Sequence, residues 1–167
     1  AVGIAVAFAL LRGLASSDGG KLGNFFVDVV RAVLYVLLPL SLVLALVGVW
    51  QGSPQTFQGY ETVQLLEPVS VDAEGTLVDA DDPTAVQEVT EAVVPLGPQS
   101  SQVAIKQLGT NGGGFNGANS ASALENPTPL TNLLQCAAMP LIPFALVFAF
   151  GRMVGDRRQS RALMTVV

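Results

Sequence analysis

The sequence predicts an all-α membrane protein in which two spanning helices enclose a short re-entrant helix and a glycine-rich loop. Half of the 167 residues are apolar and only 13% are charged, whereas a soluble domain carries about a quarter charged residues. The apolar residues are concentrated in two long uncharged stretches, 32–50 and 130–151. The basic residues cluster before the first stretch and after the second, as they do in loops on the cytoplasmic side of a membrane.

The composition excludes several kinds of active site. The chain has no histidine and one cysteine, Cys136, so a Ser-His-Asp triad, a His-rich zinc site and an internal disulfide framework are impossible. A net charge of −5 argues against nucleic acid as a partner. The chain starts at Ala1 and ends in an apolar run, so we expect it to be a segment of a longer protein.

The first three elements follow from length and charge. Residues 1–14 are expected to be the end of a preceding transmembrane helix, since this apolar stretch is too short to span and lacks a basic lead-in. Residues 15–31 are predicted to form a cytoplasmic loop that carries basic residues. Residues 32–50 have the length of about 20 residues that a spanning helix needs, and Trp50 is placed to anchor its outer end.

Residues 51–97 are predicted to form an external acidic loop. Between Arg31 and Lys106 there is no basic residue, but there are nine acidic ones, which places this stretch on the outer side. Short alternating runs such as 61–65 favour a small β-hairpin. The alternative is a solvated loop without regular structure.

The second complete span is predicted at 131–151, and residues 152–167 are expected to form a cytoplasmic loop and the start of the next span. Membrane helices tolerate proline where neighbouring groups satisfy the freed carbonyls, so we expect kinks near Pro39, Pro140 and Pro143. Burial of both helices in a large soluble core is disfavoured, because 167 residues cannot easily surround two helices that are apolar on every side.

Residues 98–108 are predicted to form a re-entrant pore helix. Pro98 suits the first turn of a helix, and Ser100 or Ser101 can cap that turn. Gly109 is a natural end for the helix. About ten residues cannot cross a bilayer, and two spans flank the segment, so the helix is expected to dip in from outside and return.

Residues 109–130 are predicted to form a filter and return loop, because three consecutive glycines follow Thr110 and Asn111. Glycine lets successive carbonyls turn toward one point, and a ring of carbonyls can replace the water around a potassium ion. The carboxyl end of the preceding helix adds partial negative charge. A phosphate-binding loop would need a Gly-Lys-Ser/Thr sequence, which is absent, and a flexible linker is the remaining alternative.

The sequence around these glycines closely resembles one family. The run Gly109–Phe115, the triplet Ala118–Ser120 and the run Glu125–Asn132 are similar to the potassium-binding A subunit of the bacterial Kdp potassium-transporting ATPase. Leu22–Asn24 and Gly155–Gln159 resemble the same family in the same order.

The resemblance implies a potassium-channel-like fold of four repeats, each with a span, a pore helix, a filter loop and a second span. This segment is similar to the second repeat. The implied filter positions are Thr110, Asn111, Gly112, Gly113 and Gly114, with potassium held at the first four. Lys106, Phe115, Asn119 and Asn126 are the implied supporting residues. Potassium is the transported ion, and no bound cofactor is implied.

The resemblance also implies a subunit that is not an enzyme by itself. ATP hydrolysis would reside in a separate P-type subunit. The expected partners are that subunit, small accessory subunits, the other pore repeats of the same chain and the lipid membrane. The expected location is the bacterial plasma (inner) membrane, crossed several times. The alternatives are a gradient-driven, channel-like potassium uptake protein and a membrane-anchored binding or scaffolding protein.

Two polar features have open interpretations. Lys106 is expected to lie near polar groups, because an unpaired lysine near the bilayer centre costs about 2.5–3.5 kcal/mol on insertion scales. It could extend outward, pair with Glu125, or pair with a carboxylate of another subunit. Asn126 and Thr128 could tie the return loop to the filter, or simply form an Asn-Pro turn.

Overall fold

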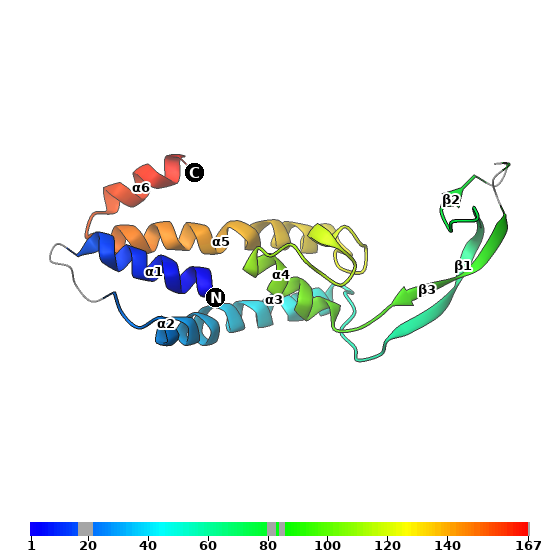
Figure 1. The fold of residues 1–167 in the computed structure, drawn as a ribbon, viewed down its shortest axis with the longest axis horizontal. Coiled ribbons are helices and arrows are strands. Elements are labelled where there is room, and N and C mark those ends of the chain that lie inside the picture. Colours follow the sequence, from blue (N-terminus) through cyan, green and yellow to red (C-terminus); the bar gives the residue numbers. More distant parts are fainter. Residues whose placement is uncertain (17–21, 80–82, 84–85, 167) are drawn as a thin grey trace. The chain divides into compact units, whose positions relative to one another are not determined.

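A computed structural model of the chain describes residues 1–16, 22–79, 83 and 86–166. The chain divides into a helical unit, Ala1–Pro54 with Gln99–Val167, and a sheet unit, Gln55–Pro98 (Figure 1). Lys21 was expected to add positive charge to the cytoplasmic loop, and Asp81 and Asp82 to add negative charge to the external one. These three residues lie outside the described part.

The first long helix of the helical unit runs from Phe25 to Trp50. It comprises α2 (Phe25–Arg31), η1 (Ala32–Leu37) and α3 (Leu38–Trp50). Its start is set by Asn24, whose side chain accepts hydrogen bonds from the N–H groups of Phe26 and Val27 at 3.0 and 3.2 Å. The helix therefore begins ahead of the predicted range 32–50, and residues 25–31 are helical rather than part of a loop.

Helix α1 (Val2–Ala15) is joined to α2 by an ion pair. The Arg12 guanidinium donates to both carboxylate oxygens of Asp28, one of them at 2.9 Å, and to the Leu22 carbonyl at 3.0 Å. It also lies 5.9 Å from the centroid of the Phe8 ring, within the range of a cation–π contact. Arg12 is one of the basic residues that precede the first long apolar stretch, and in the structure its side chain links α1 to α2.

Pro39 changes the hydrogen bonding of the first long helix. Proline has no N–H group and cannot bond to the carbonyl four residues earlier. Just ahead of it, η1 is a π-helical segment, and the Leu38 N–H bonds to the Val33 carbonyl five residues back. The disturbance predicted near Pro39 is therefore a locally wider helix.

Helices α4 (Gln99–Gly109) and α5 (Pro129–Met153) follow the sheet unit in the chain. Thr128 starts α5 with a capping box, because its hydroxyl accepts from the Thr131 N–H at 3.2 Å and its own N–H donates to the Thr131 hydroxyl at 3.1 Å. Pro129 then occupies the first turn, where its missing N–H is no loss. Helix α5 continues through Pro140 and Pro143.

Two shorter helices complete the helical unit. The single turn η2 (Ala118–Ser120) lies in the return loop, and α6 (Arg157–Val166) lies in the range predicted as a loop and the start of the next span. A Cβ atom at Gly151 would lie 2.5 Å from the Ser160 Cβ. Helices α5 and α6 therefore approach closely at a position where only glycine fits.

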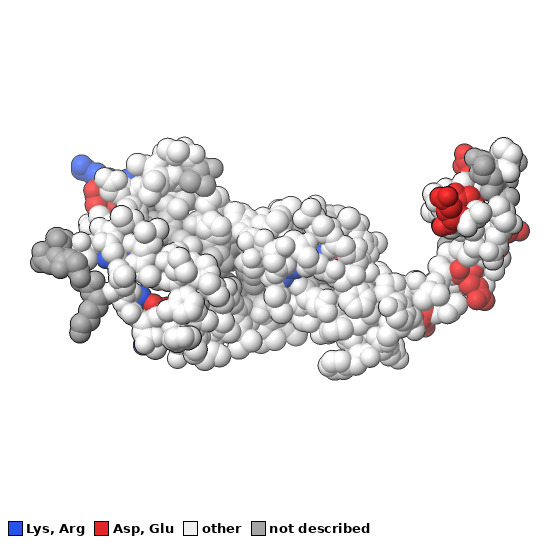
Figure 2. Space-filling view, viewed as in Figure 1, with Lys and Arg blue, Asp and Glu red and all other residues white. Residues whose placement is uncertain are grey.

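The long helices expose their apolar side chains. In the part of the chain that the structure describes, Phe25–Trp50 and Pro129–Met153 are two helices long and apolar enough to cross a membrane. Helices of a soluble core would bury such residues, but Leu46 is 62% exposed and Leu133 is 65% exposed. The face of the helical unit in Figure 2 is mostly uncharged between its ends. These surfaces suit lipid or further membrane helices.

The sheet unit contains three antiparallel strands, β1 (Tyr60–Val71), β2 (Leu77–Val78) and β3 (Gln87–Pro95), in the order β2-β1-β3. Tyr60 pairs with Pro95, and the register shifts between Gln64 and Val69, as at a β-bulge. The Asp72 carboxylate shapes the β1–β2 turn by accepting from the N–H groups of Glu74 and Thr76 at 2.9 and 2.8 Å.

This sheet is larger than the small hairpin that the sequence suggested. The unit carries the described acidic side chains of the predicted loop, several of which appear in red on the sheet unit in Figure 2. One of them, Glu91, accepts a hydrogen bond of 2.5 Å from the Gln64 side chain on the neighbouring strand.

Candidate functional site

Helix α4 is a short helix packed between longer ones. It contacts both α3 and α5 (Figure 1). On the α3 side, the Ser100 hydroxyl donates to the Ala45 carbonyl at 2.7 Å, and Gly48 makes room for it, since a Cβ atom there would overlap the Ser100 hydroxyl. The helix is thus anchored to α3 by a hydrogen bond to the backbone at a place where the two helices approach closely.

The buried face of α4 is largely polar. It contains Gln99, Ser100, Lys106 and Gln107, all at most 5% exposed, beside the apolar Val103, Ala104 and Leu108. Polar side chains that leave water need hydrogen-bond partners. Ser100 bonds to α3, whereas the partners of Gln99, Lys106 and Gln107 lie in the loop that follows and in the first turns of α5. The polar face of α4 therefore organises that loop.

The predicted filter residues form a continuous exposed loop at the carboxyl end of α4. Thr110, Asn111, Gly113 and Gly114 are exposed and Gly112 is half-buried. Thr110 and Gly112 have positive φ values of 50° and 70°, which turn the chain sharply out of the helix. The Asn111 side-chain oxygen accepts from the Gly113 N–H at 3.2 Å. The helix directs its partially negative end toward this loop.

The three glycines of the loop differ in what surrounds them. Gly112 has a left-handed backbone that disfavours other residues. No described atom lies within 4 Å of a Cβ atom built on Gly113. A Cβ atom on Gly114 would lie 2.5 Å from the Lys106 ammonium and 2.9 Å from a Glu125 carboxylate oxygen. Gly113 therefore faces open space, while Gly114 presses against two buried charges.

Those charges form an ion pair behind the loop. The Lys106 ammonium donates to Glu125 Oε2 at 2.6 Å, and both side chains are 1% exposed. Glu125 Oε1 also accepts from the Asn116 N–H at 3.3 Å. Of the three arrangements expected for Lys106, the structure has the pair with Glu125.

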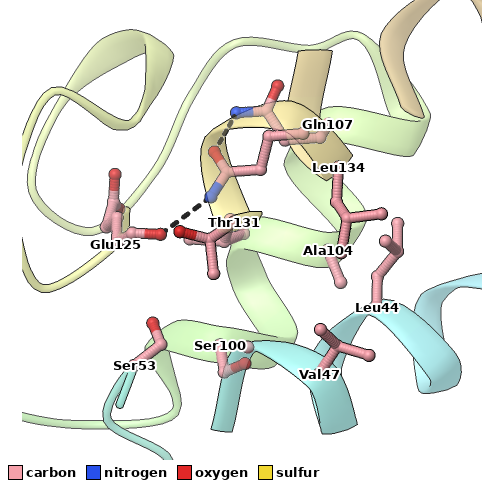
Figure 3. A pocket seen from close by; sticks show the side chains of 12 residues that line it. Leu44, Val47, Ser53, Ser100, Ala104, Gln107, Glu125, Thr131 and Leu134 are labelled. Atoms are coloured by element: carbon pink, nitrogen blue, oxygen red, sulfur yellow. Dashed lines mark hydrogen bonds between the residues drawn. The ribbon is translucent and has the colours of Figure 1, made fainter. Parts of the chain in front are cut away.

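A second set of polar contacts links α4, the return loop and α5. Gln107 Nε2 lies 3.0 Å from the Ser120 hydroxyl and 3.1 Å from Gln135 Oε1. Gln135 in turn donates to the Glu125 carbonyl at 2.9 Å. Gln107, Gln135 and Glu125 line a cavity of about 30 Å³ between α3, α4 and α5, which Figure 3 shows from close by. The site is therefore held by amide groups as well as by the ion pair.

The remaining supporting residues have separate positions. The Asn126 amide accepts from the Thr131 hydroxyl at 2.8 Å and donates to Asn132 at 3.1 Å, so these bonds tie the return loop to α5 rather than to the filter positions. Phe115 is 43% exposed. Asn119 has a φ of 60° and donates its N–H to the Gly112 carbonyl at 3.3 Å, which joins the return loop to the glycine run.

The sequence reasoning missed four polar residues of the site, Gln99, Gln107, Asn116 and Gln135. Asn116 donates to Gln99 Oε1 at 2.7 Å, which adds another contact between the loop and α4. A signal was present, because Gln99, Val103, Lys106 and Gln107 recur at the spacing of one helix face. Buried glutamines on a helix that lies between two membrane spans need hydrogen-bond partners.

The chain matches the family model of the potassium-transporting ATPase A subunit over residues 1–167. A potassium-transporting ATPase potassium-binding subunit from Solidesulfovibrio magneticus is 54% identical over 167 residues, which is 100% of this chain and 28% of that protein. The protein of the same description from Clostridium botulinum is 53% identical over 100% of this chain and 27% of its own length. One from Geobacter sulfurreducens is 50% identical, with 100% and 30% covered.

The chain thus spans between a quarter and a third of the length of these curated relatives. The match to the family model extends over both long helices, the sheet unit and the glycine-rich loop. The chain belongs to the potassium-transporting ATPase A subunit family.

Proposed function

We propose that this chain is the second pore repeat of a potassium-binding and translocating subunit in an ATP-driven potassium uptake complex. The observation that carries the proposal is the exposed loop Thr110–Gly114, which begins at the carboxyl end of the packed helix α4 between two membrane-capable helices. The relatives, at 53–54% identity, are described as potassium-binding subunits.

The loop has the chemistry that a monovalent cation needs. Backbone carbonyls can replace the hydration shell of potassium, and the loop offers no carboxylate that would favour a divalent ion. Thr110, Asn111, Gly112 and Gly113 are the proposed ion-binding positions, and Gly114 ends the set. The open space beside Gly113 supports an ion path along that side of the loop. The other pore repeats would complete the ring.

ATP hydrolysis belongs, in this proposal, to a separate P-type subunit, and this chain is not an enzyme by itself. The sequence lacks a Gly-Lys-Ser/Thr phosphate loop. Small accessory subunits and the lipid membrane complete the partners. Membership of an ATPase subunit family favours this arrangement over gradient-driven uptake, which would continue without ATP, and over a scaffolding role, which would need no ion.

The ion site can be located directly in the full-length protein assembled with its partner subunits. Thallium can replace potassium and scatters strongly enough to mark the ion. We expect a density peak in contact with the carbonyl oxygens of residues 110–113. A peak at the acidic side chains of the sheet unit, with none at this loop, would contradict the proposal.

We further propose a multi-pass protein of the bacterial plasma (inner) membrane, with residues 51–97 outside and the arginines after α5 in the cytoplasm. Thr76 and Gln159 are exposed and lie one in each region, whereas Ser160 is buried against Gly151. In a full-length Cys136→Ala background, an impermeant thiol reagent should label Thr76→Cys in intact cells. It should label Gln159→Cys only after the cells are opened, and the reverse pattern would refute this topology.

A further inference from the structure

The buried pair of Lys106 and Glu125 lies directly behind the end of the glycine run. The two side chains are among the largest that the described part of the chain buries completely. One comes from α4 and the other from the return loop, 19 residues apart in sequence. The pair therefore closes the loop between them, and that loop contains every proposed ion-binding position.

The pair acts on the loop through backbone contact. Gly114 lies so close to both charged groups that a single added carbon would be 2.5 Å from the Lys106 nitrogen. The Asn116 N–H donates to Glu125, and the Asn116 side chain donates to the fully buried Gln99 at 2.7 Å. Gly114 thus lies against the pair, and Asn116 ties the end of the glycine run to Glu125 and to α4.

We propose that Lys106 and Glu125 are positioning residues that set the ion selectivity of the loop by fixing its carboxyl-terminal end at Gly114. This inference rests on the proposed function. In the cavity-fit account of filter selectivity, a carbonyl ring discriminates between ions because the protein limits how far its carbonyls can move. The hydrogen bonds of Gly112 and Gly113 stay within the loop, where Gly112 accepts from Asn119 and Gly113 donates to Asn111. The anchor at Gly114 therefore limits how far the carbonyls of residues 110–113 can adjust to an ion of another size.

The charges of Lys106 and Glu125 account for how firmly the pair holds the loop. Hydrogen bonds between charged groups are shorter and stronger than those between neutral groups, and they gain further strength where water is excluded. A buried ion pair adds little stability over apolar side chains of similar volume. Its contribution is instead a fixed geometry, which a neutral pair of the same shape would hold less firmly.

The test replaces both charges together, since removing one alone would leave the other buried without its partner. The double variant Lys106→Met with Glu125→Gln keeps the volumes and leaves an oxygen to accept from Asn116. The matched control is Arg12→Met with Asp28→Asn, which removes the ion pair between α1 and α2. Both are made in the full-length protein assembled with its partner subunits, and uptake of potassium, rubidium and sodium is compared.

We expect the double variant to assemble and to lose about tenfold of its discrimination against sodium or rubidium, roughly the factor that one hydrogen bond to a charged group contributes. The control should discriminate as the unmodified protein does. Gly114→Ala keeps both charges but displaces the backbone from them, and it should shift discrimination in the same direction. Unchanged discrimination in either assembled variant overturns the proposal.

The experiment distinguishes failure of this proposal from failure of the proposed function. If Gly113→Ser alters selectivity while the double variant does not, the loop binds the ion but the pair does not position it. If neither changes selectivity, the ion-binding assignment itself fails.

Discussion

Replacing Glu125 by glutamine alone should sharply reduce the amount of folded, assembled protein. The change keeps the shape of the side chain but leaves the Lys106 ammonium, which is 1% exposed, without its counter-charge. Breaking a buried ion pair by removing one partner costs about 3–5 kcal/mol, a large part of the about 5–15 kcal/mol that stabilises a typical folded domain. The yield of complex after solubilisation and its thermal unfolding midpoint measure this loss.

Two comparisons make the result specific. Glu88→Gln removes an exposed carboxylate of the sheet unit, and we expect it to change stability by less than about 1 kcal/mol. The double variant Lys106→Met with Glu125→Gln should recover most of the yield that Glu125→Gln loses, because no unpaired charge remains. A Glu125→Gln variant as stable as Glu88→Gln would show that the pair is not buried in the assembled protein.

The spanning helices were predictable from composition, but their boundaries were not. Long apolar runs show where a helix can cross a membrane. The first helix nevertheless begins at Phe25, because Asn24 caps it and because Asp28 is neutralised by Arg12. Read locally, Asp28 and Arg31 suggest a polar loop. Only the contact with α1 shows that a charge is accommodated within the helix.

The glycine-rich loop was predictable because its residues are consecutive. Its position after a short helix and between two spans made the glycine run an ion-binding candidate, and the family resemblance gave Thr110–Gly114 as the expected filter positions, which stays a prediction. The distinct surroundings of the three glycines were not predictable, since they depend on the contact between Glu125 and Lys106 of α4. A lysine in an apolar region must find a partner, but sequence alone offered several carboxylates.

The amide contacts were the least visible feature of the site. Gln107, Gln135 and Gln99 have partners 10 to 28 residues away in the chain, and a glutamine can bond to almost any polar group. Sequence spacing placed Gln107 and Gln99 on one helix face but did not predict their hydrogen-bond partners. Alternating side chains favoured a β-hairpin, whereas the short strand β2 depends on the turn that Asp72 shapes.

Gly113→Ser should weaken potassium binding while leaving this chain folded. The Gly113 φ lies outside the left-handed range, and no described atom lies within 4 Å of a Cβ atom placed there, so the serine fits without strain. Its side chain would enter the open space beside the proposed carbonyl ring. A loss of about 1.4 kcal/mol in ion binding corresponds to a tenfold weaker apparent affinity.

The chain offers a closely matched control in Gly59→Ser. Gly59 lies in the sheet unit, is exposed, also has open space around its Cβ position and has no left-handed backbone. The same chemical change there should leave ion binding unaltered, because the residue is remote in sequence from the proposed ion-binding positions.

The ratio of the apparent affinities for potassium and sodium, measured for Gly113→Ser in the full-length assembled complex, is the most direct test of the ion-binding assignment. We predict that this ratio falls about tenfold relative to Gly59→Ser, with assembly and ATP hydrolysis chemistry intact. An assembled Gly113→Ser complex with the same affinity and the same ratio as the Gly59→Ser control would contradict the assignment of Thr110–Gly114 as the potassium filter.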